Sequence, residues 1–192
     1  MHNNKINTLS KNLLQKLIGN KKTVKNRVFI MMVGYSLSGK TTFARKLAKN
    51  YPFLIIESRQ IHQLINKRFK ELQDDDTVSG TGYNLRQELT TKIRQNLLTK
   101  LLPQGWPIIA DSCHLEFKKR KIILDLARKN HYFTIIIWLK TPEKILLSRL
   151  KLADQKRIMQ KQKPAWVDLY QKLQKKKFDP PKENEANVII KI

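Results

Sequence analysis

The chain has 192 residues, with 39 Lys and Arg against 15 Asp and Glu, which gives a formal net charge of +24. Its length suits one domain with a sizeable core, and the single cysteine, Cys113, excludes an internal disulfide. No apolar run approaches the roughly 18 residues that a membrane span needs, so we expect a protein of the reducing cytoplasm.

Residues 1–26 form a basic leader that contains no acidic residue. Its apolar residues are spaced for one face of a short amphipathic helix. They are Leu9, Leu13, Leu14, Leu17 and Ile18. We favour a helix packed on the core, or a frayed tail. The alternative is a basic arm for a membrane, a nucleic acid or a partner protein.

A nucleotide-binding loop is predicted directly after the apolar run Val28–Val33, the first expected strand. The next residues fit the pattern G-x-x-x-x-G-K-[ST] and open a helical pattern. They are Gly34, Tyr35, Ser36, Leu37, Ser38, Gly39, Lys40, Thr41 and Thr42. Backbone N–H groups of such a turn converge on phosphate oxygens. Lys40 would reach the β- and γ-phosphates, and the Thr41 hydroxyl would bind Mg²⁺.

Strand and helix patterns alternate after this loop, as a parallel sheet with helical crossovers requires. The further predicted strands span residues 53–57, 107–111, 132–139 and 187–192. The further predicted helices span residues 59–70, 83–102, 118–130, 142–153 and 164–177. A polar loop at 73–82 and a basic, weakly apolar stretch at 154–163 separate some of them.

Polar residues follow two of the predicted strands at the sheet edge where such folds bind ligands. Glu57, Ser58 and Arg59 end the second strand, and Asp111 ends the third. Asp111 is therefore a candidate to hold Mg²⁺, directly or through water, or to orient the attacking group. The alternative is an aspartate that only caps a turn or helix. We favour the metal or catalytic role, because the third strand usually lies beside the loop strand in this architecture.

With these features together, the chain resembles the P-loop kinases of the polynucleotide 5′-hydroxyl kinase and zeta-toxin type, the AAA_33 group. The resemblance covers residues 27–192. It rests on the phosphate loop, the acidic turn at 108–112, the segment 139–143 before Arg149, and the tail 178–181 that leads to 187–190. It implies one P-loop kinase domain over 27–192. The implied fold is a three-layer P-loop NTPase fold with a five-stranded parallel sheet in the order 2-3-1-4-5 and a small helical lid.

The resemblance also implies roles for individual residues. Family members transfer the γ-phosphoryl group of ATP to a hydroxyl. By this likeness, Lys40 and Thr41 bind phosphate and Mg²⁺, and Asp111 lies in the active site. Residues 149–165 resemble a lid that supplies cations to the transferring phosphoryl group. The candidates in it are Arg149 and Arg157, followed by Lys151 and Lys156.

One part of the family pattern is missing at the second strand. Many polynucleotide kinases of this type carry there an Asp that acts as base on the acceptor hydroxyl, followed by an Arg that binds the acceptor. Those positions fall here close to Arg59 and His62, so neither matches. Glu57 is the candidate substitute for the base.

Three functions stay open at this point. We prefer an ATP- and Mg²⁺-dependent kinase that acts on a polynucleotide 5′-hydroxyl, because the positive charge attracts nucleic acid without reading its sequence. The second is a kinase for a small molecule such as a nucleotide sugar, a nucleoside or an antibiotic. The third is an ATP-binding switch or nucleic-acid-binding module without transfer activity.

Overall fold

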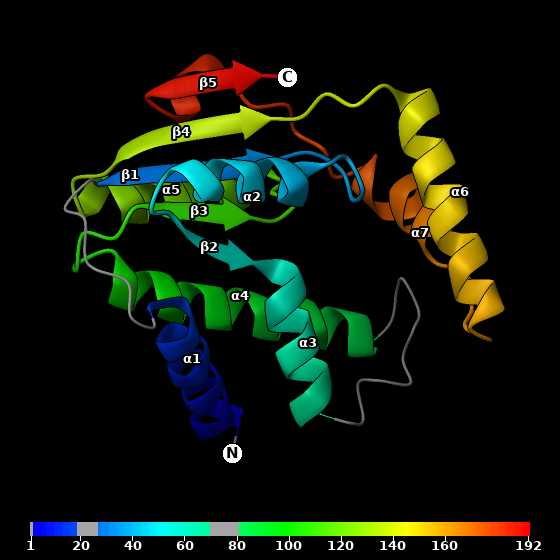
Figure 1. The fold of residues 1–192 in the computed structure, drawn as a ribbon, viewed down its shortest axis with the longest axis horizontal. Coiled ribbons are helices and arrows are strands. Elements are labelled where there is room, and N and C mark those ends of the chain that lie inside the picture. The colour runs from blue at the N-terminus through cyan, green and yellow to red at the C-terminus, as the bar shows by residue number, and fades with distance from the viewer. Residues whose placement is uncertain (1, 19–26, 70–80) are drawn as a thin grey trace.

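Five parallel strands form one sheet in the order β2-β3-β1-β4-β5 in the computed structural model, which describes residues 2–18, 27–69 and 81–192 (Figure 1). The strands are β1 Val28–Val33, β2 Leu54–Glu57, β3 Ile108–Asp111, β4 Phe133–Trp138 and β5 Val188–Lys191. This order and the flanking helices confirm the predicted three-layer α/β fold. The central strand β1 pairs with β3 on one side and with β4 on the other.

The helices agree with the predicted alternation except around residue 154. They are α1 His2–Ile18, α2 Lys40–Asn50, α3 Ser58–Arg68, α4 Thr81–Leu101, α5 Phe117–Lys129, α6 Glu143–Met159 and α7 Trp166–Asp168. A π-helical segment, η2 Leu169–Gln174, and a short 3₁₀ helix, η3 Glu183–Glu185, complete the chain. Most of the predicted polar loop at 73–82 lies outside the described residues.

Helix α6 is longer than predicted, because it continues through the first part of the stretch expected to be irregular. Residues 154–159 are mostly good helix formers in spite of their weak apolar pattern. Asp154 sits inside the helix and accepts hydrogen bonds from the backbone N–H groups of Ala165, Trp166 and Val167. The same residue therefore caps the start of α7.

The apolar run of β1 is explained by burial on both faces of the sheet, which leaves no polar side to the strand. Phe29, Met31 and Val33 belong to the larger core cluster, together with side chains of α1, α4 and α5. Ile30 and Met32 point to the opposite face and join a smaller cluster with α2. In Figure 1, α2 covers the front of the sheet and α5 lies behind it.

Helix α1 packs against α4 at the far end of this larger cluster (Figure 1). Its side chains Ile6, Leu9 and Leu13 are buried there. Lys11, on another side of the same helix, is exposed. The described part of the basic leader thus contributes directly to the core.

We predict that Leu13→Ala lowers the free energy of unfolding by about 2–4 kcal/mol, because the substitution opens a cavity between α1 and the core. Lys11→Ala on the exposed side should change it by less than about 0.5 kcal/mol. Urea unfolding measures both. Equal stability of the two variants would contradict the packing of α1.

Candidate active site

The candidate site lies at the carboxyl ends of β1, β2 and β3, which meet at one edge of the sheet. The register between β2 and β3 sets Glu57 opposite Asp111. The chain leaving β1 turns there into the phosphate loop, residues 34–42, and then into α2. Three of the polar segments predicted from the sequence therefore share this edge.

Two glycines give the phosphate loop its shape. Gly34 has a φ of 145°, and a Cβ atom at this position would lie 2.9 Å from the carbonyl oxygen of Leu139. Gly39 has a φ of 101° and directly precedes α2. Both conformations are rare for residues with a side chain. A side chain at either position would therefore strain the loop, which fits a backbone shaped to bind phosphate.

Lys40, the first residue of α2, is buried and folds back across the loop that precedes it. Its Nζ atom donates hydrogen bonds to the carbonyl oxygen of Tyr35 and, over 3.2 Å, to Oγ of Ser38. An ammonium group held in this position faces the interior of the loop. It can therefore neutralise the charge of a phosphate bound there.

Thr41 and Asp111 form the contact between the loop and the third strand. The Thr41 hydroxyl donates a 2.6 Å hydrogen bond to Oδ2 of Asp111, which is buried. Burial raises the pKa of Asp111, and the hydrogen bond from Thr41 and the charge of Lys40 oppose that shift. A hydroxyl and a carboxylate oxygen are ligands that Mg²⁺ accepts. The two residues predicted to hold the metal are therefore brought together.

Phosphate oxygens and water would have to complete such a magnesium site. Within the ranges that the structure describes, no group of three or more His, Cys, Asp or Glu side chains gathers to hold a metal ion. Mg²⁺ commonly keeps several waters and binds through one or two carboxylates plus substrate phosphates. The donor set at this edge fits that pattern.

Glu57, the candidate base, forms an ion pair that no sequence pattern indicated. Arg45 of α2 donates to both of its carboxylate oxygens, with Nε to Oε1 at 3.0 Å and Nη2 to Oε2 at 2.9 Å. The Glu57 side chain is 4% exposed, whereas Arg45 is 56% exposed. Both oxygens of the candidate base are therefore engaged by the guanidinium group.

The two arginines predicted to clamp the phosphoryl group differ in position. Arg149 of α6 donates a 3.1 Å hydrogen bond to the carbonyl oxygen of Leu37 in the phosphate loop. Arg157 lies two turns further along α6, and its Nε donates to the carbonyl oxygen of Lys163 over 2.7 Å. Arg149 is thus placed at the loop, whereas the Nε of Arg157 bonds the backbone that follows its own helix.

The π-helical segment η2 also contacts the phosphate loop, which sequence patterns did not indicate. Oε1 of Gln174 accepts a 3.0 Å hydrogen bond from the Ser36 N–H, and Nε2 of Gln174 donates to Oγ of Ser36 over 2.6 Å. The ring of Tyr170 packs edge-on against Tyr35, with ring centroids 5.0 Å apart. Residues after α6 therefore support one wall of the loop.

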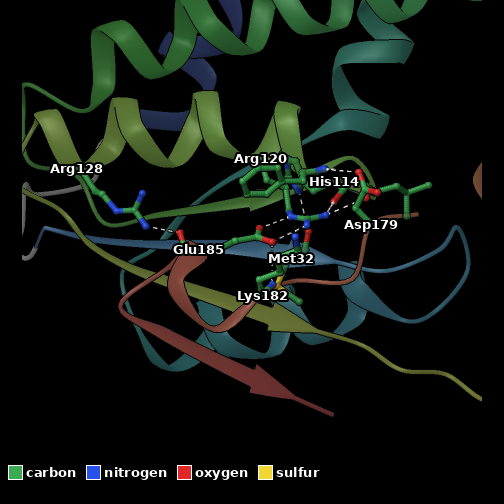
Figure 2. Close-up of polar contacts among 9 residues, drawn as sticks. Met32, His114, Arg120, Arg128, Asp179, Lys182 and Glu185 are labelled. Atoms are coloured by element: carbon green, nitrogen blue, oxygen red, sulfur yellow. Dashed lines mark hydrogen bonds and ion pairs between the residues drawn. The ribbon is translucent and has the colours of Figure 1, made fainter. Parts of the chain in front are cut away.

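The turn after β3 is held by a buried arginine, as Figure 2 shows. Arg120 of α5 is fully buried, and its Nη1 donates to the carbonyl oxygens of His114 and Leu115 at 3.0 and 2.9 Å. Its other nitrogens donate to both carboxylate oxygens of Glu185 at 2.7 and 2.9 Å. Arg128 adds a hydrogen bond to the Glu185 carbonyl oxygen (Figure 2). The segment that follows Asp111 is thereby tied to the C-terminal part of the chain.

His114 lies in this turn and is enclosed as a neutral ring. Its Nδ1 is 2.8 Å from the carbonyl oxygen of Met32, so this nitrogen is the N–H donor (Figure 2). Burial, together with the charge of Arg94, lowers its pKa to about 3. The unfolded chain, with an ordinary histidine pKa of about 6.5, takes up a proton at a higher pH than the folded chain.

We predict that the stability contributed by the buried, neutral His114 is complete above pH 6.5. It is lost as the pH falls towards 3, because only the unfolded state binds the proton in that range. When the pH falls from 7 to 5, the free energy of unfolding should decrease in both proteins. The decrease should be about 2 kcal/mol smaller in His114→Asn than in the wild type. Urea unfolding at both pH values measures this difference. The exposed His131, which shares the left-handed backbone conformation, provides the control His131→Asn. An unchanged pH dependence in His114→Asn would contradict the prediction.

Comparison with known proteins gives the family of the chain. Solved structures share the fold at low sequence identity. A structure from the PezAT chromosomal toxin–antitoxin system of Streptococcus pneumoniae has a TM-score of 0.70 and 21% identity. The match covers 82% of this chain and 65% of the pneumococcal chain. A putative kinase from Chloroflexus aurantiacus has a TM-score of 0.59 and 15% identity, over 86% of this chain and 84% of that one.

A gluconokinase from Sinorhizobium meliloti has a TM-score of 0.52 and 18% identity, over 86% of this chain and 83% of the gluconokinase chain. Curated protein sequences gave no match. In the part of the chain that the structure describes, no helix has the length and apolar character needed to cross a bilayer.

The family model AAA_33, described as an AAA domain, matches residues 29–181. Because this match spans most of the sequence, the chain belongs to the AAA_33 family.

Proposed function

We propose that the protein is an ATP- and Mg²⁺-dependent phosphotransferase that moves the γ-phosphoryl group of ATP to a hydroxyl. The hydrogen bond between Thr41 and Asp111 beside the glycine-shaped loop is the observation that carries this proposal. It joins a magnesium-binding hydroxyl and a carboxylate at the point where a β- or γ-phosphate would lie. Membership of the AAA_33 family supports the nucleotide part of the proposal.

In this mechanism the protein acts mainly by positioning and by neutralising charge. The backbone N–H groups of the loop and the Lys40 ammonium would bind the phosphates. Thr41 and Asp111 would hold Mg²⁺, which when bound would supply positive charge to neutralise the phosphates. Arg149, already at Leu37 of the loop, would stabilise the charge that develops on the transferred group.

The proposed lid, residues 149–165, would bring further cations over this site. It consists of the second half of α6 and the turn before α7. Arg157 would need to leave its contact with the Lys163 carbonyl oxygen to take part. We therefore rank Arg149 above Arg157.

For the acceptor proton, Glu57 is our candidate base. Its ion pair with Arg45 opposes this role as long as the pair is closed. Arg45 is 56% exposed, however, so its side chain can turn into solvent when an acceptor enters. A persistent pair would instead favour the ATP-binding switch without transfer activity.

We propose a polynucleotide 5′-hydroxyl as the first acceptor to test, supported by the net charge of +24. A small-molecule acceptor is the second candidate. It is supported by the description of one structural neighbour as a gluconokinase, although the likeness to that protein extends only to the fold. We also propose that the protein acts in the cytoplasm.

Lys40→Ala should lower ATP turnover at least about 100-fold, because the substitution removes the ammonium that would stabilise the phosphate charge. Lys46→Ala, on an exposed side of the same helix, should retain the wild-type rate. A coupled assay of nucleotide release measures both variants. If Lys40→Ala binds and turns over ATP as the wild type does, the nucleotide site lies elsewhere.

The acceptor can be identified with γ-labelled ATP. The purified protein is incubated with 5′-hydroxyl oligonucleotides in one arm and with a metabolite pool in the other. Label in the oligonucleotide identifies the polynucleotide kinase, and label in a metabolite identifies the small-molecule kinase. Label in neither arm, with ATP binding intact, supports the switch and contradicts transfer.

A further inference from the structure

One arginine outside the phosphate loop and the proposed lid lies between the ends of β2 and β3. Arg94 of α4 donates a 2.6 Å hydrogen bond from Nη2 to Oγ of Ser58, and the same nitrogen lies 3.4 Å from Oγ of Ser112. These serines directly follow Glu57 and Asp111, the last residues of the two strands. The guanidinium group therefore stands at the same sheet edge as the phosphate loop.

Arg94 lacks the partner that a buried cation ordinarily has. Its Nε is enclosed and makes no hydrogen bond. Among the residues that the structure describes, no carboxylate pairs with it, and its two hydrogen-bond partners are neutral hydroxyls. Burial lowers its pKa to about 10, so the group stays charged at neutral pH. An enclosed charge without a counter-ion is strongly unfavourable.

A second arginine, Arg120, is fully buried and shows how such a charge is usually compensated. Arg120 is bound on two sides by the carboxylate of Glu185 and uses its remaining nitrogen on backbone carbonyl oxygens. Both side chains are guanidinium groups next to the turn after β3. Of these two arginines, only Arg94 has N–H groups left to bind an anion. Arg94 is half-buried, whereas Arg120 is fully buried.

The surroundings of Arg94 are also electropositive. His62 of α3 is half-buried, and its Nε2 has no hydrogen-bond partner. Its pKa is lowered to about 4 by burial and by the charges of Arg86 and Arg94. The histidine is therefore neutral at pH 7 and adds no further positive charge. Arg86 and Arg94 thus both lie close enough for their positive charge to act on this histidine.

We propose that Arg94 binds an oxyanion of the acceptor substrate, a phosphate or a carboxylate group, with the hydroxyls of Ser58 and Ser112 as additional donors. This inference rests on the proposed phosphotransferase function, because it assigns the acceptor half of that site. The planar fork of arginine suits such groups. An acceptor held there has its anionic end at the tips of β2 and β3, next to both Glu57 and Asp111.

This assignment narrows the class of acceptor. A neutral alcohol leaves Arg94 uncompensated and should be a poor substrate. In an oligonucleotide, the anion is the phosphodiester next to the 5′-terminal nucleoside. In a small molecule, it is a phosphate ester or a carboxylate carried by the same molecule as the reacting hydroxyl.

The test is a thermal unfolding experiment with inorganic phosphate as the probe in one arm and acetate in the other. Both are added to protein that contains saturating Mg²⁺ and a non-hydrolysable ATP analogue, so that the phosphate loop is occupied. Four proteins are compared: the wild type, Arg94→Met, Arg94→Lys and Lys100→Met. Lys100 is an exposed residue of the same helix, so its variant loses one charge without touching the site.

A ligand that binds only the folded state raises the unfolding temperature. We expect phosphate or acetate to raise it in the wild type and in Lys100→Met. This rise should exceed the rise in Arg94→Met by about 3 °C or more. Whichever anion gives the larger difference identifies the acceptor group. Without anion, Arg94→Met should be at least as stable as the wild type, since it removes an uncompensated charge. Arg94→Lys should bind the same anion at least about tenfold more weakly, because it lacks the fork.

Equal shifts in the wild type and in Arg94→Met, or no shift in the wild type, would overturn the proposal. If Arg94→Met does not fold, the comparison with Arg94→Lys decides, and unchanged anion affinity in that variant overturns the proposal. The readout does not depend on phosphoryl transfer. Arg94-dependent anion binding in a protein that transfers no label would therefore sustain the anion site while the kinase function fails.

Discussion

The position of β1 between β3 and β4 is the constraint on which the rest of the site depends. Because the strands are parallel, their carboxyl ends meet at one edge, and the chain leaving β1 has to turn there. That turn passes so close to the chain after β4 that a Cβ atom on Gly34 would lie 2.9 Å from the Leu139 carbonyl oxygen. The sheet backbone thus fixes the loop relative to Asp111 and to the segment that enters α6.

Two arginines on either side of the turn after β3 differ in how their positive charge is compensated. On one side, Arg120 and Glu185 neutralise each other and tie the C-terminal segment to α5, which holds the turn in place. On the other side, Arg94 contacts only hydroxyls among the described residues. The first arrangement gives a rigid support, and the second leaves binding capacity at the sheet edge. In our proposal, structural support and anion binding are therefore provided by separate arginines.

The fold and the donor half of the site could largely be predicted, because their signals are local. The apolar run of β1 indicates a strand buried on both faces, and the spacing of Gly34, Gly39 and Lys40 defines the loop within a few residues. The end of α6 was missed, since residues 154–159 combine good helix formers with a weak apolar pattern. Arg45 and Arg94 were missed for another reason: no motif distinguishes them from the many other cations of the chain.

The sequence by itself determined the alternation of strands and helices and the phosphate loop, because each of these follows from hydrophobic periodicity or from fixed short spacing. Only the tertiary structure decided which charges meet. Arg45 lies 12 residues from Glu57 and Arg120 lies 65 residues from Glu185, and the crossovers between strands bring these pairs together. Such contacts depend on how distant segments pack, and a linear pattern of residue types does not specify which distant residues come into contact.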